Sequence, residues 1–236
     1  MDTRFRGHDN APMMRFRRSR GGSVVREWVE SIVIALLLAV FIRSYFIQPF
    51  KIPSGSMRMT LVEGDHLFVS KLRYGPNVLP PMHFQFGEPS KVTTQEPLKL
   101  GWPSFLEPLT KKRLPGFSKP QRGDVIVFVF PEDNTKDFIK RLIGLPGDSV
   151  EIKEGKIYIN GQLMDDERIK NTYYYNRGDY GAEGQVIQVP QGYMYVLGDN
   201  SASSHDSRYW GFVPETDVLG KAEFIFWPLN RIRLIK

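Results

Sequence analysis

Three short stretches of the sequence carry residue types that could perform nucleophilic catalysis. The first, at residues 52–57, reads Ile-Pro-Ser-Gly-Ser-Met. Proline and glycine favour a tight loop there, which would expose a serine hydroxyl and bring backbone N–H groups close to a bound carbonyl. Most Ser-Gly-Ser triplets are ordinary turns, so this stretch alone does not distinguish a nucleophile from a turn.

The second stretch places two adjacent cations in an apolar setting. Residues 137–148 read Asp-Phe-Ile-Lys-Arg-Leu-Ile-Gly-Leu-Pro-Gly-Asp. In a strand, Lys140 would share a face with Phe138 and Leu142, and Arg141 would lie on the opposite face. Desolvation readily lowers the pKa of a lysine, and a neutral lysine can act as a general base, whereas arginine stays charged and needs a carboxylate. The alternative is an edge strand with both cations in solvent, which this stretch alone favours.

The third stretch, residues 198–211, is a polar loop rich in hydroxyls and carboxylates that includes a tryptophan near its end. Such a loop is either a solvated turn or part of a site. A serine–histidine–aspartate triad would be another nucleophilic arrangement, but no pattern places a histidine beside Ser56. We therefore expect the four histidines to be structural or exposed: His8, His66, His83 and His205.

Short strands must position these stretches. Residues 47–53 are expected to be extended, because the prolines at 49 and 53 oppose a helix and push their predecessors towards the β region. From residue 122, β-branched and aromatic runs alternate with Gly, Asp, Asn and Pro, and Asn160-Gly161 predicts a hairpin turn. The pattern predicts strands at 66–71, 124–131, 138–142, 149–152, 157–159, 186–189, 193–197 and 222–227.

An apolar segment precedes the strands. Residues 31–42 are uncharged, a run short enough that a removed signal peptide or a buried helix are alternatives to a membrane span. No small-residue cleavage site with a polar start follows, since residues 46–50 stay largely hydrophobic. We therefore expect an uncleaved transmembrane anchor over residues 27–46. Its flanks suit a membrane interface, with Trp28, Glu30, Arg43 and Tyr45.

Positive charge is concentrated ahead of this segment. The formal net charge of the 236 residues is +6, and residues 1–26 contribute most of it through seven arginines against two aspartates. The remainder is close to neutral, which argues against a nucleic-acid-binding surface. The positive-inside rule places residues 1–26 in the cytoplasm and the chain after about residue 46 outside. With no cysteine, the chain can form no disulfide, thiolate metal site or cysteine nucleophile.

Taken together, these stretches resemble bacterial type I signal peptidases, also called leader peptidases. The similarity covers residues 27–75 and 121–228. It rests on a nucleophile motif, a core strand, a lysine motif and a last polar motif, in the family's order and after an N-terminal anchor. These lie at 53–57, 122–128, 137–148 and 198–214.

The resemblance implies a Ser/Lys dyad with Ser56 as the nucleophile and Lys140 as the general base. The Ser54 hydroxyl and the Ser56 N–H would form the oxyanion hole, and Ser204 would orient the Lys140 amine. Four ion-pair partners would hold the site, and seven residues would line shallow pockets for small substrate side chains. The ion-pair partners are Arg141, Asp199, Asp206 and Arg208, and the pocket residues are Phe50, Ile52, Pro53, Met57, Leu61, Phe138 and Ile139.

The implied fold is mainly β, a coiled antiparallel sheet with a small inserted β domain, preceded by one N-terminal transmembrane helix. The catalytic domain would comprise residues 47–148 and 193–236, with 149–192 as the insert. Residues 76–120, which show neither helical nor strand period, would be a long excursion.

The implied activity is the removal of signal peptides from exported preproteins at the outer face of the cytoplasmic membrane. Cleavage would follow small residues, pass through an acyl-enzyme and need no metal or cofactor. The expected partners are preproteins and membrane lipid, without nucleic acid, and the protein is expected to be monomeric. Two departures from the family's pattern are Met59, where proline is usual, and Ser201-Ala202-Ser203, which replaces a customary Arg-Asp-Asn.

Two other classes of protein share parts of this pattern. A membrane-tethered β domain could bind exported chains without catalysis, but retention of both Ser56 and Lys140 argues against it. A self-cleaving repressor also uses a Ser–Lys dyad, but it would need a DNA-binding helix-turn-helix where the arginine-rich anchor stands.

Overall fold

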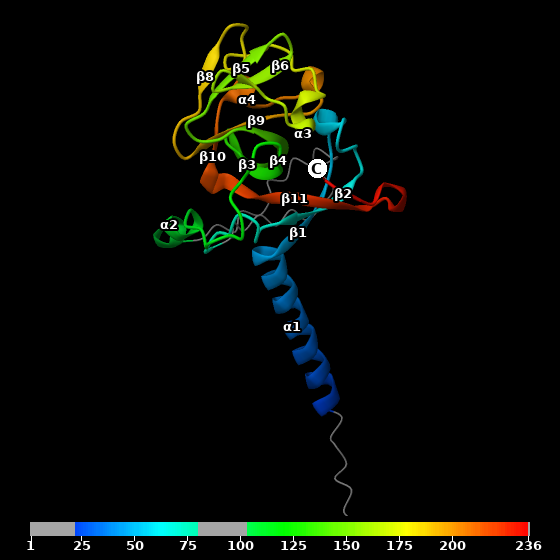
Figure 1. Cartoon of the computed structure of the whole chain (residues 1–236). Helices are drawn as coiled ribbons and strands as arrows, with labels where there is room; N and C mark the ends of the chain where they lie inside the picture. Colours follow the sequence, from blue (N-terminus) through cyan, green and yellow to red (C-terminus); the bar gives the residue numbers. More distant parts are fainter. Residues whose placement is uncertain (1–21, 80–102, 236) are drawn as a thin grey trace, which may run out of the picture. The chain divides into compact units, whose positions relative to one another are not determined.

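The structure is a computed structural model that describes residues 22–79 and 103–235 (Figure 1). The chain divides after Val40 into two compact units, and both β-sheets belong to the second. The predicted basic N-terminus and the middle of the predicted excursion lie outside the described residues.

The helix α1 spans Gly22–Tyr45 and contains the predicted apolar segment. Its large apolar side chains are exposed, among them Leu36 and Leu37. The helix ends four residues before Pro49, which cannot donate a helical hydrogen bond. No helix in the described parts of the chain is both long enough and apolar enough for a membrane crossing. The transmembrane anchor at 27–46 therefore remains a prediction.

The larger sheet has eight strands, and every pair in it is antiparallel. Its order is β1-β2-β11-β3-β4-β9-β10, with β12 paired to β11. Pro49 lies in the edge strand β1, where a missing N–H is tolerated. The strands are β1 Ile47–Lys51, β2 His66–Ser70, β3 Val125–Phe130, β4 Asp133–Gly144, β9 Tyr193–Leu197, β10 Val213–Pro214, β11 Val218–Trp227 and β12 Arg233–Leu234.

The smaller sheet has four strands in the order β7-β6-β5-β8. Asn160 and Gly161 form the turn between β6 and β7 with φ of 53° and 77°, a left-handed conformation that suits both residue types, so the predicted hairpin is confirmed. The strands are β5 Ser149–Lys153, β6 Lys156–Ile159, β7 Gln162–Leu163 and β8 Val186–Gln188, and the short helix α3 covers Glu167–Lys170. The mainly β, antiparallel fold class is confirmed, while the exact limits of the insert stay a prediction.

Alternation along β3 divides the core of the larger sheet. Val125, Val127 and Val129 join one apolar cluster, and Ile126 and Phe128 join another on the opposite face. All six residues of β3 are buried, so β3 is a central strand. The neighbouring strand β4 therefore runs through the interior of the protein at its second half.

A buried carboxylate links the larger sheet to the helix α3. Asp124, just before β3, accepts hydrogen bonds from the Tyr74 hydroxyl at 2.7 Å and from the Lys221 amine of β11 at 2.6 Å. Arg168 of α3 reaches the same carboxylate at 3.4 Å and donates to the Arg122 carbonyl at 2.6 Å. A side chain from the small-sheet region thus contacts a residue at the centre of the large sheet.

Several one-turn helices complete the fold. Two of them lie in residues 76–120, where no helical period was found in the sequence. The described part of residues 76–120 contains a helical turn and the helix α2, and a bridge pairs Asn77 with Arg113. A single helical turn shows no detectable period, which is why the sequence pattern missed it. The short helices are η1 Gly55–Met57, η2 Ser104–Leu106, α2 Glu107–Thr110, η3 Ser201–Ser203, α4 Ser207–Trp210, η4 Glu215–Asp217 and η5 Leu229–Arg231.

Candidate active site

Ser56 lies in the short helix η1, which begins directly after the extended residue Ser54. Two bonds from Asn200 hold this turn: its side-chain amide donates to the Gly55 carbonyl and its backbone N–H donates to the Ser56 carbonyl, each at 2.9 Å. The next residue, Met57, is fully buried in the core. The backbone at Ser56 is therefore held by the loop that contains Asn200 and by the burial of Met57 in the core.

Lys140 of β4 meets this serine. The Lys140 Nζ atom donates to the Ser56 Oγ atom at 2.8 Å and to the Ile139 carbonyl at 3.0 Å. It also lies 5.2 Å from the centre of the Phe138 ring. Lys140 is 4% exposed and Ser56 8%, so the pair is nearly excluded from water. Lys140 pairs with Ile126 of β3, so both side chains lie on the same face of the sheet. This is the apolar face with Phe138 and Leu142 that was predicted for Lys140.

Burial also controls the protonation of Lys140. Desolvation lowers the pKa of the Lys140 amine to about 8, while the charges of Asp206 and Asp199 act in the opposite direction. A substantial fraction of this lysine is therefore neutral near pH 8, and a neutral amine hydrogen-bonded to a hydroxyl can accept its proton.

Arg141 lies on the other face of β4 and is paired. Its guanidinium donates to both Asp199 carboxylate oxygens, at 2.7 and 2.6 Å, and to the Gly123 carbonyl at 2.6 Å. Thr60 bonds both partners, accepting from Arg141 and donating to Asp199. Arg141 and Asp199 are each 2% exposed, so this is a fully desolvated ion pair. Through Thr60, this ion pair connects the residues that follow η1 to the loop after β9.

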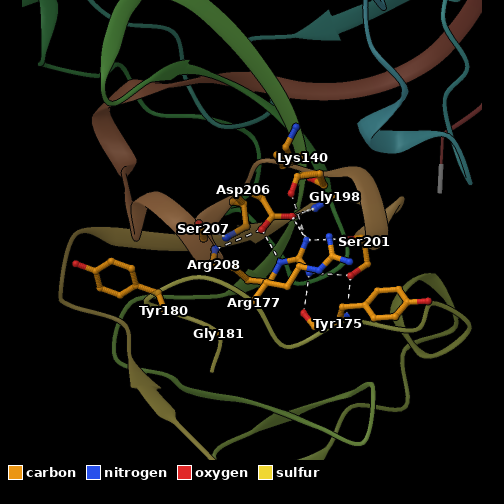
Figure 2. A network of polar contacts seen from close by, with 12 residues as sticks. Lys140, Tyr175, Arg177, Tyr180, Gly181, Gly198, Ser201, Asp206, Ser207 and Arg208 are labelled. Carbon is orange, nitrogen blue, oxygen red and sulfur yellow. Dashed lines mark hydrogen bonds and ion pairs between the residues drawn. The ribbon is translucent and has the colours of Figure 1, made fainter. Parts of the chain in front are cut away.

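A second buried ion pair joins Asp206 and Arg208 (Figure 2). The guanidinium meets both carboxylate oxygens at 2.8 Å, and both side chains are wholly buried. Asp206 also accepts from the Gly198 N–H at 3.0 Å. Asp206 is the N-cap of α4, which fixes its position at the base of the polar loop.

The structure differs from the expectation for Ser204. The Ser204 Oγ atom is buried and has no hydrogen-bond partner within residues 22–79 and 103–235, so the expected bond to Lys140 is not formed here. The Lys140 amine donates instead to Ser56 and Ile139. Ser204 packs against Gly198: a β-carbon on that glycine would lie 2.1 Å from the Ser204 hydroxyl. Ser54, the other expected hydroxyl, is exposed.

The expected pocket residues divide between two faces of β4. Met57 and Leu61 have no exposed surface, so in this structure they lie beneath the surface instead of lining it. Phe138 packs on the opposite face, stacked on Phe130 at 4.2 Å between ring centres. Pro53 is exposed, and the remaining expected pocket residues belong to one apolar cluster: Phe50, Ile52, Met57, Leu61 and Ile139.

The two described histidines contact aromatic rings. His66 lies 5.8 Å from the Phe226 ring, and His205 lies 5.2 Å from the Tyr209 ring. The described partner of the Ser56 hydroxyl is Lys140. His8 and His83 lie outside the described residues.

Three polar residues of the site were not identified from the sequence. They are Asn200 and Thr60, described above, and Ser207, whose Oγ atom accepts from the Val196 N–H at 3.0 Å. Asn200 and Ser207 belong to the polar loop at residues 198–211, whose density of hydroxyls and carboxylates indicates a site. Thr60 gave none, because an isolated threonine near a turn is common.

Known proteins are similar in sequence to this chain. The family model described as signal peptidase, peptidase S26, matches residues 25–227. A signal peptidase I of Rickettsia massiliae is 33% identical, with 86% of this chain and 79% of the relative aligned. One of Leptolyngbya laminosa is 31% identical over 90% and 85% of the two chains. A solved signal peptidase I of Enterococcus faecalis is 38% identical over 44% of this chain and 97% of that chain, with a TM-score of 0.37.

Proposed function

The chain belongs to the signal peptidase S26 family, a family of serine peptidases that remove signal peptides, and we propose that it acts through a dyad of Ser56 and Lys140. The observation that carries the proposal is the 2.8 Å contact between the Lys140 amine and the Ser56 hydroxyl, both buried. Family membership supports the same pair, because it makes serine the nucleophile and these residues lie within proton-transfer distance.

The proposed reaction has two halves. Neutral Lys140 takes the proton of the Ser56 hydroxyl as its oxygen attacks the scissile carbonyl, and the resulting ammonium protonates the leaving amine. Lys140, neutral again, then removes a proton from the water that hydrolyses the acyl-enzyme. The Ser56 N–H and the Ser54 hydroxyl would stabilise the oxyanion, and loss of one such donor typically costs on the order of 10²–10³ in rate.

The two buried ion pairs support this arrangement. Arg141 with Asp199 secures the end of the η1 loop, and Asp206 secures Gly198 in the loop that faces Ser56. Each pair satisfies a charge that would otherwise be buried alone, which is costly. We propose a positioning role for these four residues, without contact to the reacting atoms.

Incubation of the full-length protein with a preprotein tests the function directly. Sequencing of the new N-terminus should locate a single cut at the end of the signal peptide. Ser56→Ala, which removes the proposed nucleophile and little volume, should yield no cut. Cleavage at the same bond by Ser56→Ala would contradict the proposal.

Cleavage should depend on small side chains in the substrate. The apolar cluster beside Ser56 includes Ile52 and Ile139, and the fully packed Met57 beneath it leaves little room for a deep pocket. Replacing alanine by tryptophan at the first or third position before the cut should lower kcat/KM by about 5- to 150-fold, since overpacking typically costs 1–3 kcal/mol. Alanine to serine at the same positions is the matched control. Equal cleavage of the tryptophan substrates would contradict the specificity.

We also propose that α1 attaches the enzyme to the cytoplasmic membrane with the arginine-rich end inside. The support is its uncharged run of residues 31–42, the exposed apolar side chains along it and the arginines that precede it. The protein should sediment with membranes after carbonate washing. A protease added to intact spheroplasts should degrade a C-terminal tag and spare an N-terminal one. Recovery in the soluble fraction, or protection of the C-terminal tag, would contradict the proposal.

A further inference from the structure

A buried serine in the loop that follows β9 contacts residues 173–181, a segment between α3 and β8. Ser201 is 4% exposed, and its Oγ atom accepts one bond from the Tyr175 N–H and one from the Arg208 Nη1 atom, both at 2.9 Å. Its carbonyl accepts a third bond from the Arg208 Nη2 atom at 2.9 Å. A hydroxyl has two acceptor lone pairs, and here two N–H groups meet it. Figure 2 shows Ser201 between Tyr175 and Arg208.

Arg208 has its five N–H hydrogens committed. Beside Ser201 it donates to both oxygens of Asp206 and to the Tyr175 carbonyl at 2.8 Å. The geometry of a planar guanidinium is rigid, so the direction in which it presents its N–H groups to Asp206 depends on its other partners. Those partners are Ser201, the Tyr175 carbonyl and, at 3.4 Å, the Ser204 carbonyl.

The route continues from Arg208 to the site. Asp206 accepts from the Gly198 N–H, and Gly198 lies against both the Ser204 hydroxyl and the Ser56 carbonyl. A β-carbon on Gly198 would come within 2.1 and 2.6 Å of these atoms, so a small displacement of this loop reaches Ser56. The chain of contacts from residues 173–181 to Ser56 is therefore continuous and nearly free of solvent.

A second contact joins the same two segments at the surface. The Arg177 Nη1 atom donates to the Ala202 carbonyl at 2.7 Å, and the guanidinium lies 5.2 Å from the centre of the Tyr175 ring. The loop is thus held on both sides of the peptide bond between Ser201 and Ala202.

We propose that Ser201 is a positioning residue for peptide cleavage, which fastens residues 173–181 to the Arg208–Asp206 pair and thereby holds Gly198 and Ser204 against Ser56. This inference rests on the proposed Ser56–Lys140 dyad. The proposal assigns a role to Ser201, at a position where the family's pattern customarily has arginine. A larger, charged side chain could not occupy the same buried position between the Tyr175 N–H and the Arg208 guanidinium, because it would add a third donor where acceptors are required.

Steady-state kinetics of the full-length enzyme on a preprotein tests the proposal. Ser201→Ala leaves two buried N–H groups without their acceptor, one of them on a cation, so kcat should fall on the order of tenfold or more. KM should change less than about twofold, because no contact to substrate is removed. Ser201→Thr keeps the hydroxyl and should recover most of the lost kcat. Ser203→Ala is the matched control, since Ser203 lies on the same turn but is exposed.

Wild-type enzyme and Ser56→Ala are run in the same assay. An active Ser56→Ala variant or an inactive wild type would contradict the proposed Ser56–Lys140 dyad, independently of the result for Ser201. Ser201→Ala with wild-type kcat would overturn the inference, as would a rise in KM alone or an equal loss in Ser203→Ala. If Ser201→Ala does not fold, Arg177→Ala removes the exposed contact of the same two segments. It should lower kcat about two- to fivefold at unchanged KM, and unchanged kcat would overturn the inference.

Discussion

Lys140→Arg should lower kcat by about 10⁴-fold, although it keeps the charge and most of the length of the side chain. The guanidinium stays protonated at any pH at which the protein is folded, so it cannot accept the Ser56 proton. The matched control is Lys136→Arg on the same strand: the Lys136 side chain is 63% exposed and pairs with Asp133 at the surface. That variant should keep near-normal turnover. Near-normal turnover in Lys140→Arg would exclude Lys140 as the base.

The pH dependence of the wild type follows from the same lysine. Because the pKa of Lys140 is lowered to about 8, mainly by desolvation, kcat/KM should rise with pH below about 8 and level off above it. The sign is fixed by the mechanism, since protonation removes the base and activity must fall as pH falls. His66→Ala and His205→Ala should both keep this acidic limb. Its loss in either variant would point to a histidine base.

The second large effect should be on stability. Asp199→Ala leaves the Arg141 guanidinium buried without its carboxylate, which should cost about 3–5 kcal/mol of unfolding free energy. The matched control is Glu63→Ala, which breaks the exposed ion pair between Arg58 and Glu63. Solvent screens that pair, so the control should leave the denaturation midpoint almost unchanged. Urea denaturation followed by circular dichroism measures both, and equal midpoints for the two variants would contradict the assignment of Arg141 and Asp199 as a buried pair.

The site was predictable where a local pattern decides the outcome. The alternation of β4 correctly assigned Lys140 to the face of Phe138 and Leu142, and Arg141 to the opposite face, because successive side chains of a strand point to opposite sides. The edge strand with both cations in solvent, which this stretch alone favoured, was wrong, since β4 lies between β3 and β9 and both cations are buried. The same reasoning holds for the Asn160-Gly161 hairpin, whose backbone conformation few other dipeptides adopt.

Contacts between residues distant in sequence were not predictable in the same way. Thr60 and Asp199 are 139 positions apart, and no periodicity brings a threonine after a turn to a carboxylate in another loop. Tyr175 and Ser201 meet across segments on either side of β8 and β9, and their hydrogen bond depends on how both segments pack. The family resemblance supplied the ion-pair residues, but Ser201 lies where the sequence departs from the family's pattern, and only the structure shows its partners.

The Asp124 carboxylate has a consequence for the modularity of the protein. It accepts hydrogen bonds from Tyr74, from Lys221 of β11 in the larger sheet and from Arg168 of the helix α3, which follows β7 of the smaller sheet. If the smaller sheet unfolded alone, Arg168 would no longer contact Asp124. The buried negative charge of Asp124 would then be only partly compensated. We therefore expect removal or exchange of the insert to destabilise β3, the strand that follows Asp124 and pairs with the strand of Lys140.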